Sequence, residues 1–302
     1  MRIVIFGGSG LLAVNWAIYC RESHDIHLVL HRRIIHFEGV SFHTVNNFDE
    51  STIESVLKAI KPDLVVNTIA LTDVDYCEQH QAVAFATNST LASLIAAACV
   101  DLGVKLLHVS TDQLFDGEKI QYREEDVCRP VNVYGRSKLA AEKNVLNIFS
   151  EALIVRTNFF GWGTSYRQSY NEFIERTIQR KSSIYLSPSI FFSPVYLRQL
   201  VEYCMQLAII DAHGIFHVSS DERVSKRAFG HMLCVSQKLD PSFISDVEFA
   251  IGLTKVIGQR PHNMALKNQK LKDALGIETI RISDMLDALS FDQKHKTVVG
   301  LI

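Results

Sequence analysis

The stretch Arg2-Ile3-Val4-Ile5-Phe6-Gly7-Gly8-Ser9-Gly10-Leu11-Leu12-Ala13 decides the fold of this 302-residue chain. The apolar run Arg2–Phe6 predicts a buried strand, and Leu11–Arg21 predicts the helix that follows it. Between them, Gly7 and Gly10 permit a tight turn and the close approach of a pyrophosphate. The small Ala13 lets the helix pack on the strand. A dinucleotide-binding loop is the favoured interpretation, and an ordinary strand–helix turn is the alternative.

Strand-like and helix-like segments continue to alternate through the first half of the chain. The strand-like runs are continuously apolar, as in sheets that are covered on both faces. Further strands are predicted at His27–Leu30, Ser41–Val45, Asp63–Asn67, Val104–Val109 and Ala152–Arg156, and helices at Asp49–Ile60, Ala82–Leu102 and Asn132–Phe149. This alternation predicts an α/β fold with a Rossmann-type, doubly wound parallel sheet.

The second half is less regular. It contains predicted helices at Phe173–Lys181, Val195–Ile209, Ser225–Gln237 and Asn268–Leu275, and a strand at Gly214–Val218 that could return to the first sheet. We therefore expect a Rossmann domain at residues 1–160 with a return segment at 195–222. A smaller, mixed substrate-binding domain is expected at residues 161–194 and 223–302, with a cleft between the two.

Composition narrows the class of protein. Hydrophobic residues make up 47% and charged residues 21%, which is typical of a soluble globular protein. The 31 Lys and Arg balance 33 Asp and Glu, so nothing indicates binding to nucleic acid or to an anionic membrane. We expect no membrane helix, because no apolar run approaches the roughly 20 residues required. The six Cys lack CxxC spacing and no signal peptide is visible, which favours a reduced, cytoplasmic protein.

Tyr134 and Lys138 lie four residues apart in a predicted helix, so their side chains share one face. A nearby ammonium favours the phenolate, so we expect Lys138 to lower the pKa of Tyr134. Thr111 follows the strand Val104–Val109, at the edge where open α/β sheets bind ligands. Its hydroxyl could bond the same oxygen that Tyr134 protonates. The alternative is that Ser110, Thr111 and Asp112 only cap a turn.

The end of the second strand bears on the choice of dinucleotide. Arg32 stands where an NAD site usually has Asp or Glu, and arginine suits the 2′-phosphate of NADP. We therefore expect NADPH as the cofactor, with NADH as the alternative donor. The other interpretation of Arg32 is a solvated basic loop.

These motifs together make the chain resemble an extended short-chain dehydrogenase/reductase, and within that superfamily the dTDP-4-dehydrorhamnose reductases and related nucleotide-sugar 4-ketoreductases. The resemblance covers nearly the whole chain and is most specific through about residue 160. Besides the glycine loop, it is carried by Pro62–Asn67, Asp73–Asp75, Val109–Asp112, Phe115–Gly117, Tyr122–Asp126, Pro130–Lys138, Val155–Thr157 and Arg260–Pro261.

The resemblance implies roles for individual residues. Thr111, Tyr134 and Lys138 match the family's catalytic triad. The implied cofactor-binding residues are Gly7, Gly10, Leu11, Arg32, Asn67, Ile69, Ala70, Asn88, Tyr134 and Lys138. The implied substrate-binding residues are Asp112, Phe115, Asn158 and Arg260, with a surface-loop charge as the alternative for Arg260. Asp112 is followed by Gln113 where the family often has Tyr, and Met264, Ala265 and Lys267 also depart from its pattern.

The function implied by the resemblance is NADPH-dependent reduction of a nucleotide-linked 4-keto-6-deoxy sugar in deoxysugar or cell-surface polysaccharide biosynthesis. We expect no metal, a nucleotide-sugar substrate and a homodimer as the candidate assembly. A non-catalytic NADP-binding subunit, like the methionine adenosyltransferase beta subunit, is the main alternative. An epimerase or dehydratase is a third, but the second acidic residue that dehydratases usually add after the strand-end Thr is missing at Gln113, and Arg32 argues against a tightly held NAD.

Overall fold

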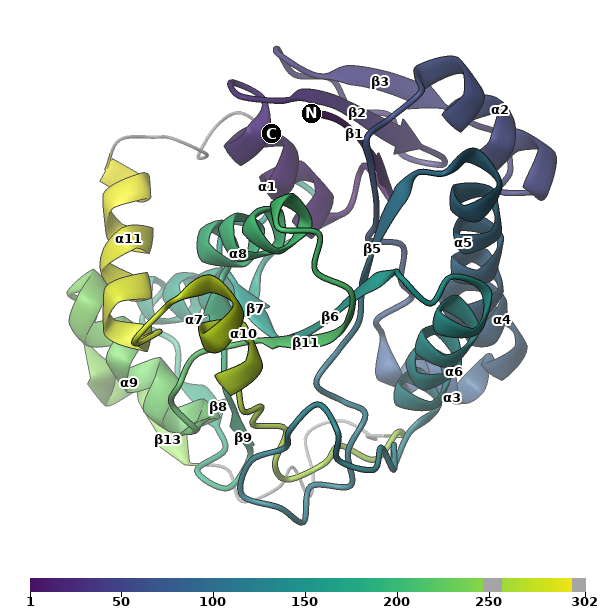
Figure 1. Cartoon of the computed structure of the whole chain (residues 1–302). Coiled ribbons are helices and arrows are strands. Elements are labelled where there is room, and N and C mark those ends of the chain that lie inside the picture. Colours follow the sequence, from purple (N-terminus) through teal and green to yellow (C-terminus); the bar gives the residue numbers. More distant parts are fainter. Residues whose placement is uncertain (247–256, 295–302) are drawn as a thin grey trace.

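The computed structural model describes residues 1–246 and 257–294 of the chain. Within these residues, a seven-stranded sheet in the order β11-β6-β5-β4-β1-β2-β3 forms the centre of the molecule (Figure 1), and its neighbouring strands are parallel. The strands are β1 (Arg2–Phe6), β2 (Asp25–Leu30), β3 (Ser41–Thr44), β4 (Leu64–Asn67), β5 (Lys105–Val109), β6 (Leu153–Thr157) and β11 (Gly214–Val218). The predicted doubly wound sheet is confirmed, and so is the return of Gly214–Val218, which pairs with β6.

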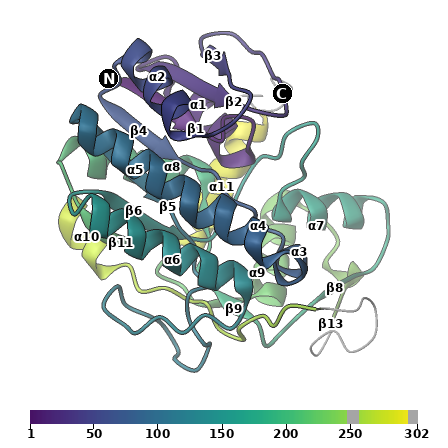
Figure 2. The same cartoon turned by 90° about the vertical axis from the view of Figure 1, so that its right-hand side faces the viewer.

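Helices cover both faces of the sheet (Figures 1 and 2). One face carries α1 (Leu11–Cys20) and α8 (Leu197–Ile209), and the other carries α2 (Glu50–Ile60), α5 (Leu91–Leu102) and α6 (Val133–Ile148). Successive β1 side chains point to opposite faces: Ile3 and Ile5 join the core under α1, whereas Val4 and Phe6 join the core under α2 and α5. This explains why the strands read as continuous apolar runs.

The helix ends follow from local chemistry. Asp49 caps α2 by accepting a hydrogen bond from the Thr52 backbone at 2.8 Å. The same helix ends where Lys61 takes a left-handed conformation before Pro62. Gly103, with φ of +63°, ends α5 in the same way.

The predicted long helix at Ala82–Leu102 is interrupted. It consists of α4 (Gln81–Phe85), a π-helical turn at Ala86–Thr90, and α5. The run Gln81–Leu102 is long and apolar enough to cross a membrane, so the expectation that no segment approaches that length was wrong. In the fold, Ile95, Ala96 and Cys99 are buried against the sheet, as in the core helix of a globular protein.

A second group of elements lies outside the seven-stranded sheet. It contains α7 (Tyr170–Gln179), α9 (Lys226–Gln237), α10 (Gln269–Leu275), α11 (Ile282–Lys294), a 3-10 turn (Pro241–Phe243), and the short strands β7 (Phe159–Phe160), β8 (Ile184–Leu186), β9 (Phe191–Phe192), β10 (Val195–Tyr196), β12 (Val224–Ser225) and β13 (Ile244–Asp246). The sequence did not predict α11 or α3 (Val74–Gln79). The proposed division into two domains stays a prediction.

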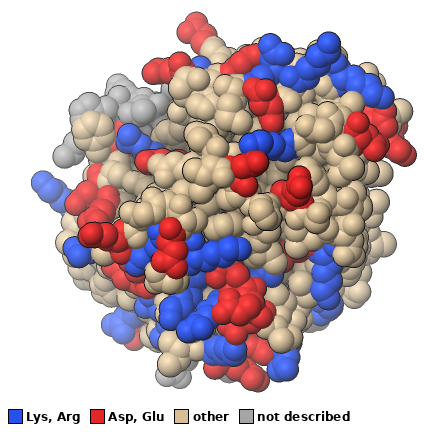
Figure 3. All heavy atoms as spheres, viewed as in Figure 1, with Lys and Arg blue, Asp and Glu red and all other residues tan. Residues whose placement is uncertain are grey.

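The surface carries acidic and basic side chains intermixed on the face that Figure 3 shows. This distribution agrees with the formal net charge of −2. Because neither sign of charge dominates on that face, it would not attract a polyanion such as nucleic acid.

Candidate functional site

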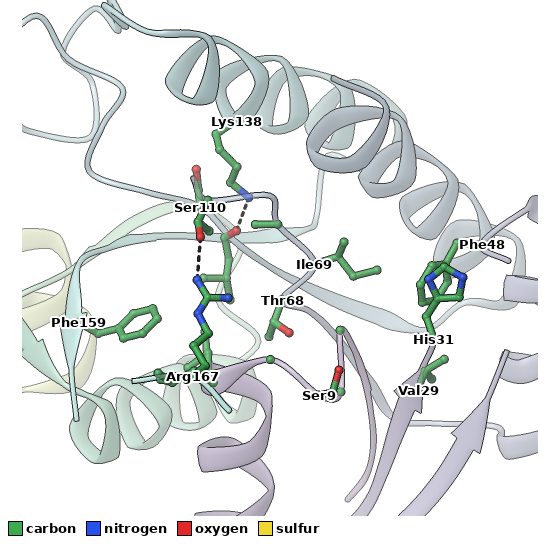
Figure 4. A pocket seen from close by; sticks show the side chains of 18 of the residues that line it. Ser9, Val29, His31, Phe48, Thr68, Ile69, Ser110, Lys138, Phe159 and Arg167 are labelled. Carbon is green, nitrogen blue, oxygen red and sulfur yellow. Dashed lines mark hydrogen bonds between the residues drawn. The ribbon is translucent and has the colours of Figure 1, made fainter. Parts of the chain in front are cut away.

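A pocket of about 290 Å³ opens at the carboxyl ends of β1, β4 and β5, where the strand order changes direction (Figure 4). Open α/β sheets bind ligands at such a switch point. Of the predicted residues, it is lined by Gly7, Gly10, Leu11, Ile69, Ala70, Tyr134 and Lys138. The pocket therefore gathers the glycine loop and the Tyr–Lys pair, which are more than a hundred residues apart in the sequence.

The glycine loop lies close to Thr68, the residue that follows β4. Gly7 has φ of +83°, and a Cβ atom there would lie 2.8 Å from Thr68 Oγ1. Gly10 precedes α1 in an extended conformation, and its N–H donates to the Gly7 carbonyl at 2.7 Å. The loop thus leaves open backbone at a helix N-terminus, which fits the pyrophosphate of a dinucleotide.

Tyr134 meets Thr111 because the first turn of α6 lies on the loop after β5. Asn132 caps that helix by accepting a hydrogen bond from Gly135 N at 2.7 Å, and it also donates to Gln113 Oε1 at 3.2 Å. A Cβ atom on Gly135 would collide with the Gln113 carbonyl. Glycine at this position therefore permits the close approach that brings the Tyr134 hydroxyl near the Thr111 hydroxyl, which acts on its pKa.

The pKa of Tyr134 is raised, contrary to the expected lowering, and Lys138 is not among the groups that shift it most. Burial raises the pKa of Tyr134 to about 12. The Thr111 hydroxyl and the Arg167 charge act in the opposite direction, whereas the Asp112 charge adds to the increase. Tyr134 is only 7% exposed, so loss of water around the phenol outweighs its polar neighbours. The protonated phenol is the form held at neutral pH.

Lys138 is 1% exposed and its nitrogen has two neighbours from β5. Lys138 Nζ donates to the Val109 carbonyl at 2.7 Å and lies 3.3 Å from His108 Nε2. Burial lowers the pKa of Lys138 to about 8, although the Glu142 charge opposes this. The nitrogen is therefore fixed at the pocket wall and poised between its charged and neutral forms.

Asn67 and Asn88 do not line the pocket but hold the backbone of the loop after β4, which does. Asn67 Oδ1 accepts from Ile69 N at 3.0 Å and so sets the turn after β4. Asn88, in the π-helical turn, accepts from Leu71 N at 2.7 Å and donates to Ser137 Oγ at 2.8 Å. The π-helical turn places Asn88 between the loop after β4 and α6. These two contacts give a reason for the interruption in the long helix.

At the end of β2, the pocket is lined by His31 and not by Arg32, for which a cofactor contact was expected. His31 and Phe48 line the pocket at the end away from Lys138 (Figure 4). Their rings pack edge to face, with centroids 5.3 Å apart. In the described part of the chain, Arg32 extends into solvent with no hydrogen-bond or ion-pair partner, and Arg33 lies over the Tyr166 ring at 4.0 Å. A role for Arg32 at a 2′-phosphate stays a prediction.

The pocket also contains residues to which the sequence analysis assigned no binding role. Thr68 and Ser110 follow strand ends, a signal that would have found them. Arg167 points into the pocket from the side facing Lys138 (Figure 4) and donates to Thr72 Oγ1 at 2.8 Å. It comes from a loop of the second group of elements, so no local pattern marked it.

The buried Asp112 and the half-buried Asn158 form a pair beside Thr111. Asn158 Nδ2 donates to Asp112 Oδ2 at 2.6 Å, and Thr111 Oγ1 donates to Asp112 Oδ1 at 3.3 Å. Burial raises the pKa of Asp112 to about 6, against the opposing effects of the Asn158 hydrogen bond and the Lys226 charge. Lys226, which was not predicted, lies over the Phe192 ring at 3.4 Å.

The structure does not bring Phe115 or Arg260 to the pocket. Phe115 is fully buried and stacks on Tyr122, with ring centroids 4.1 Å apart. Arg260 forms an ion pair with Asp75 at 3.0 Å. Phe115 therefore packs in the core and Arg260 has a carboxylate partner, and the substrate-binding role of both residues stays a prediction.

No group of three or more His, Cys, Asp or Glu side chains that could hold a metal ion occurs within residues 1–246 and 257–294.

Comparison with known proteins agrees with this geometry. The family model described as the RmlD substrate binding domain matches residues 1–290. The probable low-salt glycan biosynthesis reductase Agl14 of Haloferax volcanii is 31% identical over 251 residues, covering 82% of this chain and 83% of the relative. A dTDP-4-dehydrorhamnose reductase of Mycobacterium tuberculosis is 35% identical over 196 residues, covering 62% of this chain and 64% of the relative.

A solved structure and a more distant relative extend the comparison. The crystal structure of a hypothetical dTDP-4-dehydrorhamnose reductase from Sulfolobus tokodaii superposes with a TM-score of 0.82 at 27% identity, covering 93% of this chain and 97% of that one. The methionine adenosyltransferase 2 subunit beta of Bos taurus is 27% identical over 296 residues, covering 91% of this chain and 83% of the relative. The chain belongs to the RmlD substrate binding domain family and is an NAD(P)-dependent oxidoreductase of the extended short-chain dehydrogenase/reductase type.

Proposed function

We propose that this protein is an NADPH-dependent reductase of a nucleotide-linked 4-keto-6-deoxy sugar, acting in deoxysugar or polysaccharide biosynthesis. The observation that carries the proposal is the meeting of Thr111, Tyr134 and Lys138 beside the glycine-loop pocket. The names of the relatives, which include a glycan biosynthesis reductase and dTDP-4-dehydrorhamnose reductases, support the substrate class.

The residues divide the work as follows. When bound, NADPH supplies the hydride to the carbonyl carbon. Tyr134, a protonated phenol at neutral pH, donates its proton to the developing alkoxide. The Thr111 hydroxyl, which donates to Asp112 Oδ1 at 3.3 Å in the structure, turns to donate to the same substrate oxygen and so orients the carbonyl. Lys138, fixed by the Val109 carbonyl at 2.7 Å, replaces the tyrosine proton after each turnover and regains a proton from solvent through the open pocket.

The direct test offers NADPH and a panel of dTDP-, UDP- and GDP-linked 4-keto-6-deoxy sugars to the purified protein. Loss of the absorbance of the reduced cofactor with at least one sugar, and a product reduced at C4, is the expected result. No consumption with any of them would refute the reductase assignment.

A second candidate function is a non-catalytic, dinucleotide-binding subunit. The likeness to the methionine adenosyltransferase 2 subunit beta favours it. The discriminating result is stoichiometric NADPH binding with no turnover on the whole panel, together with co-purification of another enzyme.

We also propose a cytoplasmic location and a homodimer. The cysteines support the location, because the six in the chain are free thiols and five of them are buried. Light scattering of the purified chain measures the assembly, and a monomeric mass would contradict a homodimer.

A further inference from the structure

His108 lies in β5, and its side chain is completely buried. Its ring bridges two neighbouring elements of the site. Nδ1 lies 3.0 Å from Asn67 Nδ2 on β4, and Nε2 lies 3.3 Å from Lys138 Nζ on α6. The imidazole therefore touches the nitrogen of the lysine that serves Tyr134, although His108 itself does not line the pocket.

The hydrogen bonds of these three side chains depend on the protonation of Lys138. Asn67 Oδ1 accepts from Ile69 N at 3.0 Å, so the amide directs its NH2 group at His108 Nδ1. Nδ1 of a neutral imidazole is then an acceptor, and Nε2 carries the hydrogen. The lone pair of an amine accepts from Nε2–H, whereas an ammonium would oppose it with another donor.

The reversed amide does not remove this conflict. It would let Asn67 accept from Nδ1–H and would free Nε2 to accept from an ammonium. However, its NH2 group would then face the Ile69 N–H, and the turn after β4 would lose its hydrogen bond. The arrangement that satisfies all groups has Lys138 as an amine.

The charges around this network support a neutral imidazole. Among the described residues, the ionisable groups that act on it are Lys138 itself, Glu142 on α6, and Arg156 on β6, which pairs with Glu142 at 2.7 Å. Burial lowers the pKa of His108 well below its ordinary value, and the Lys138 charge adds to this. Because the Glu142 charge is shared with Arg156, it cannot hold Lys138 fully in the ammonium form.

We propose that His108 is a positioning residue for Lys138, whose imidazole donates to the lysine nitrogen and so stabilises the amine that remains after Lys138 has given up a proton. The inference rests on the proposed function, in which Lys138 replaces the proton of Tyr134. The ammonium loses one proton, the phenolate gains it, and the imidazole keeps its own hydrogen throughout.

The first experiment needs no substrate. The full chain, labelled with ¹⁵N-histidine, is titrated by NMR, and the His108 signals are assigned by their loss in His108→Gln. We expect these signals to move with a midpoint near pH 8, where Lys138 titrates, and to stop moving in Lys138→Met. A midpoint near the ordinary histidine value of about 6.5, or no movement from pH 6 to 10, would overturn the proposal.

The second experiment uses two matched amides. His108→Gln places a polar group near the position of Nε2, facing Lys138, whereas His108→Asn places it near Nδ1, facing Asn67. We expect His108→Asn to lower kcat about ten- to hundred-fold and to move the basic limb of the pH profile upward by about one unit. His108→Gln should restore kcat and the pH profile to within a few-fold of the parent.

Thermal unfolding and NADPH binding, measured for both variants, separate this role from a structural one. Equal losses in the two variants, or a loss with an unchanged pH profile, would contradict it. If no keto sugar is reduced, the proposed function fails, but the NMR titration still tests the contact between His108 and Lys138.

Discussion

Tyr134 keeps its proton because burial of its hydroxyl outweighs the polar groups beside it, and this decides how it acts. With its pKa raised to about 12 by burial, the phenol stays protonated through the physiological range. A donor of this kind suits reduction, in which the substrate oxygen gains a proton. Lys138, with its pKa lowered to about 8 by burial, is instead the group of the pair whose charge changes near neutral pH.

Substitution of Tyr134 tests the acid directly. Tyr134→Phe removes the proton donor but keeps the ring, so kcat should fall on the order of 10²- to 10⁴-fold. NADPH affinity and thermal unfolding should stay close to those of the parent. Tyr76→Phe, at a 43% exposed tyrosine, is the control. Normal turnover by Tyr134→Phe would contradict the assigned role.

Arg32 tests the preference for NADPH. Its guanidinium is exposed after β2, where it is free to reach a 2′-phosphate. We expect Arg32→Ala to raise the Kd for NADPH about ten- to hundred-fold and to leave the Kd for NADH unchanged. Fluorescence titration measures both constants, with the exposed Arg136→Ala as control. An equal effect on the two dinucleotides would exclude the selector role.

Asp112 predicts a dependence of stability on pH. Its pKa is about 6 in the fold, mainly because of burial, against 3.8 for the free side chain. Between these values the folded state binds more protons than the unfolded state, so the contribution of Asp112 to stability is lost as pH rises from about 4 to about 6. In urea denaturation, the free energy of unfolding of Asp112→Asn should rise relative to that of the parent by up to about 3 kcal/mol across this pH window. A constant difference between the two proteins would show that folding does not raise the pKa of Asp112.

At the scale of elements, α6 is the part that assembles the site. Its first turn carries Tyr134 and lies on the Gln113 carbonyl, as Gly135 permits. Its middle is fastened to β6 by a buried ion pair, in which Arg156 Nε and Nη2 both donate to the Glu142 carboxylate. Because both residues are 2% exposed, the pair is shielded from water and fixes how the helix lies on the sheet.

Breaking this pair should be costly. Removal of one partner leaves the other charge buried, and the free energy of unfolding should fall by roughly 3–5 kcal/mol in Glu142→Leu or Arg156→Met. The double variant should lose less than the sum of the two, as urea denaturation would show. The control is Lys58→Met, which breaks the exposed ion pair with Glu54. It should lower the free energy of unfolding by no more than about 0.5 kcal/mol. Additive losses would mean that the two charges act independently.

At the scale of the whole molecule, the second group of elements reaches back over the glycine loop. The Tyr166 hydroxyl donates to the Ser9 carbonyl at 2.8 Å, and Arg33 lies over the Tyr166 ring. From the same loop Arg167 enters the pocket. The glycine loop is therefore contacted by the second group of elements as well as by its own sheet.

Tyr166→Phe tests this link. Loss of one hydrogen bond to the loop should raise the Kd for NADPH about two- to tenfold, because the loop is then less well ordered before binding. The kcat at saturating NADPH should change little. Tyr185→Phe, at a 54% exposed tyrosine, is the matched control. An unchanged Kd would show that the contact does not support the loop.

The sequence by itself determined the parallel sheet, the glycine loop and the Tyr134–Lys138 spacing. Each of these is written in local patterns: continuous apolar runs, a strand–glycine–helix motif, and two residues one helical turn apart. Only the tertiary structure decided the burial that raises the Tyr134 pKa, the contact between His108 and Lys138, and the entry of Arg167. These depend on which side chains other elements bring near and on how much water they exclude, and no local pattern contains that information.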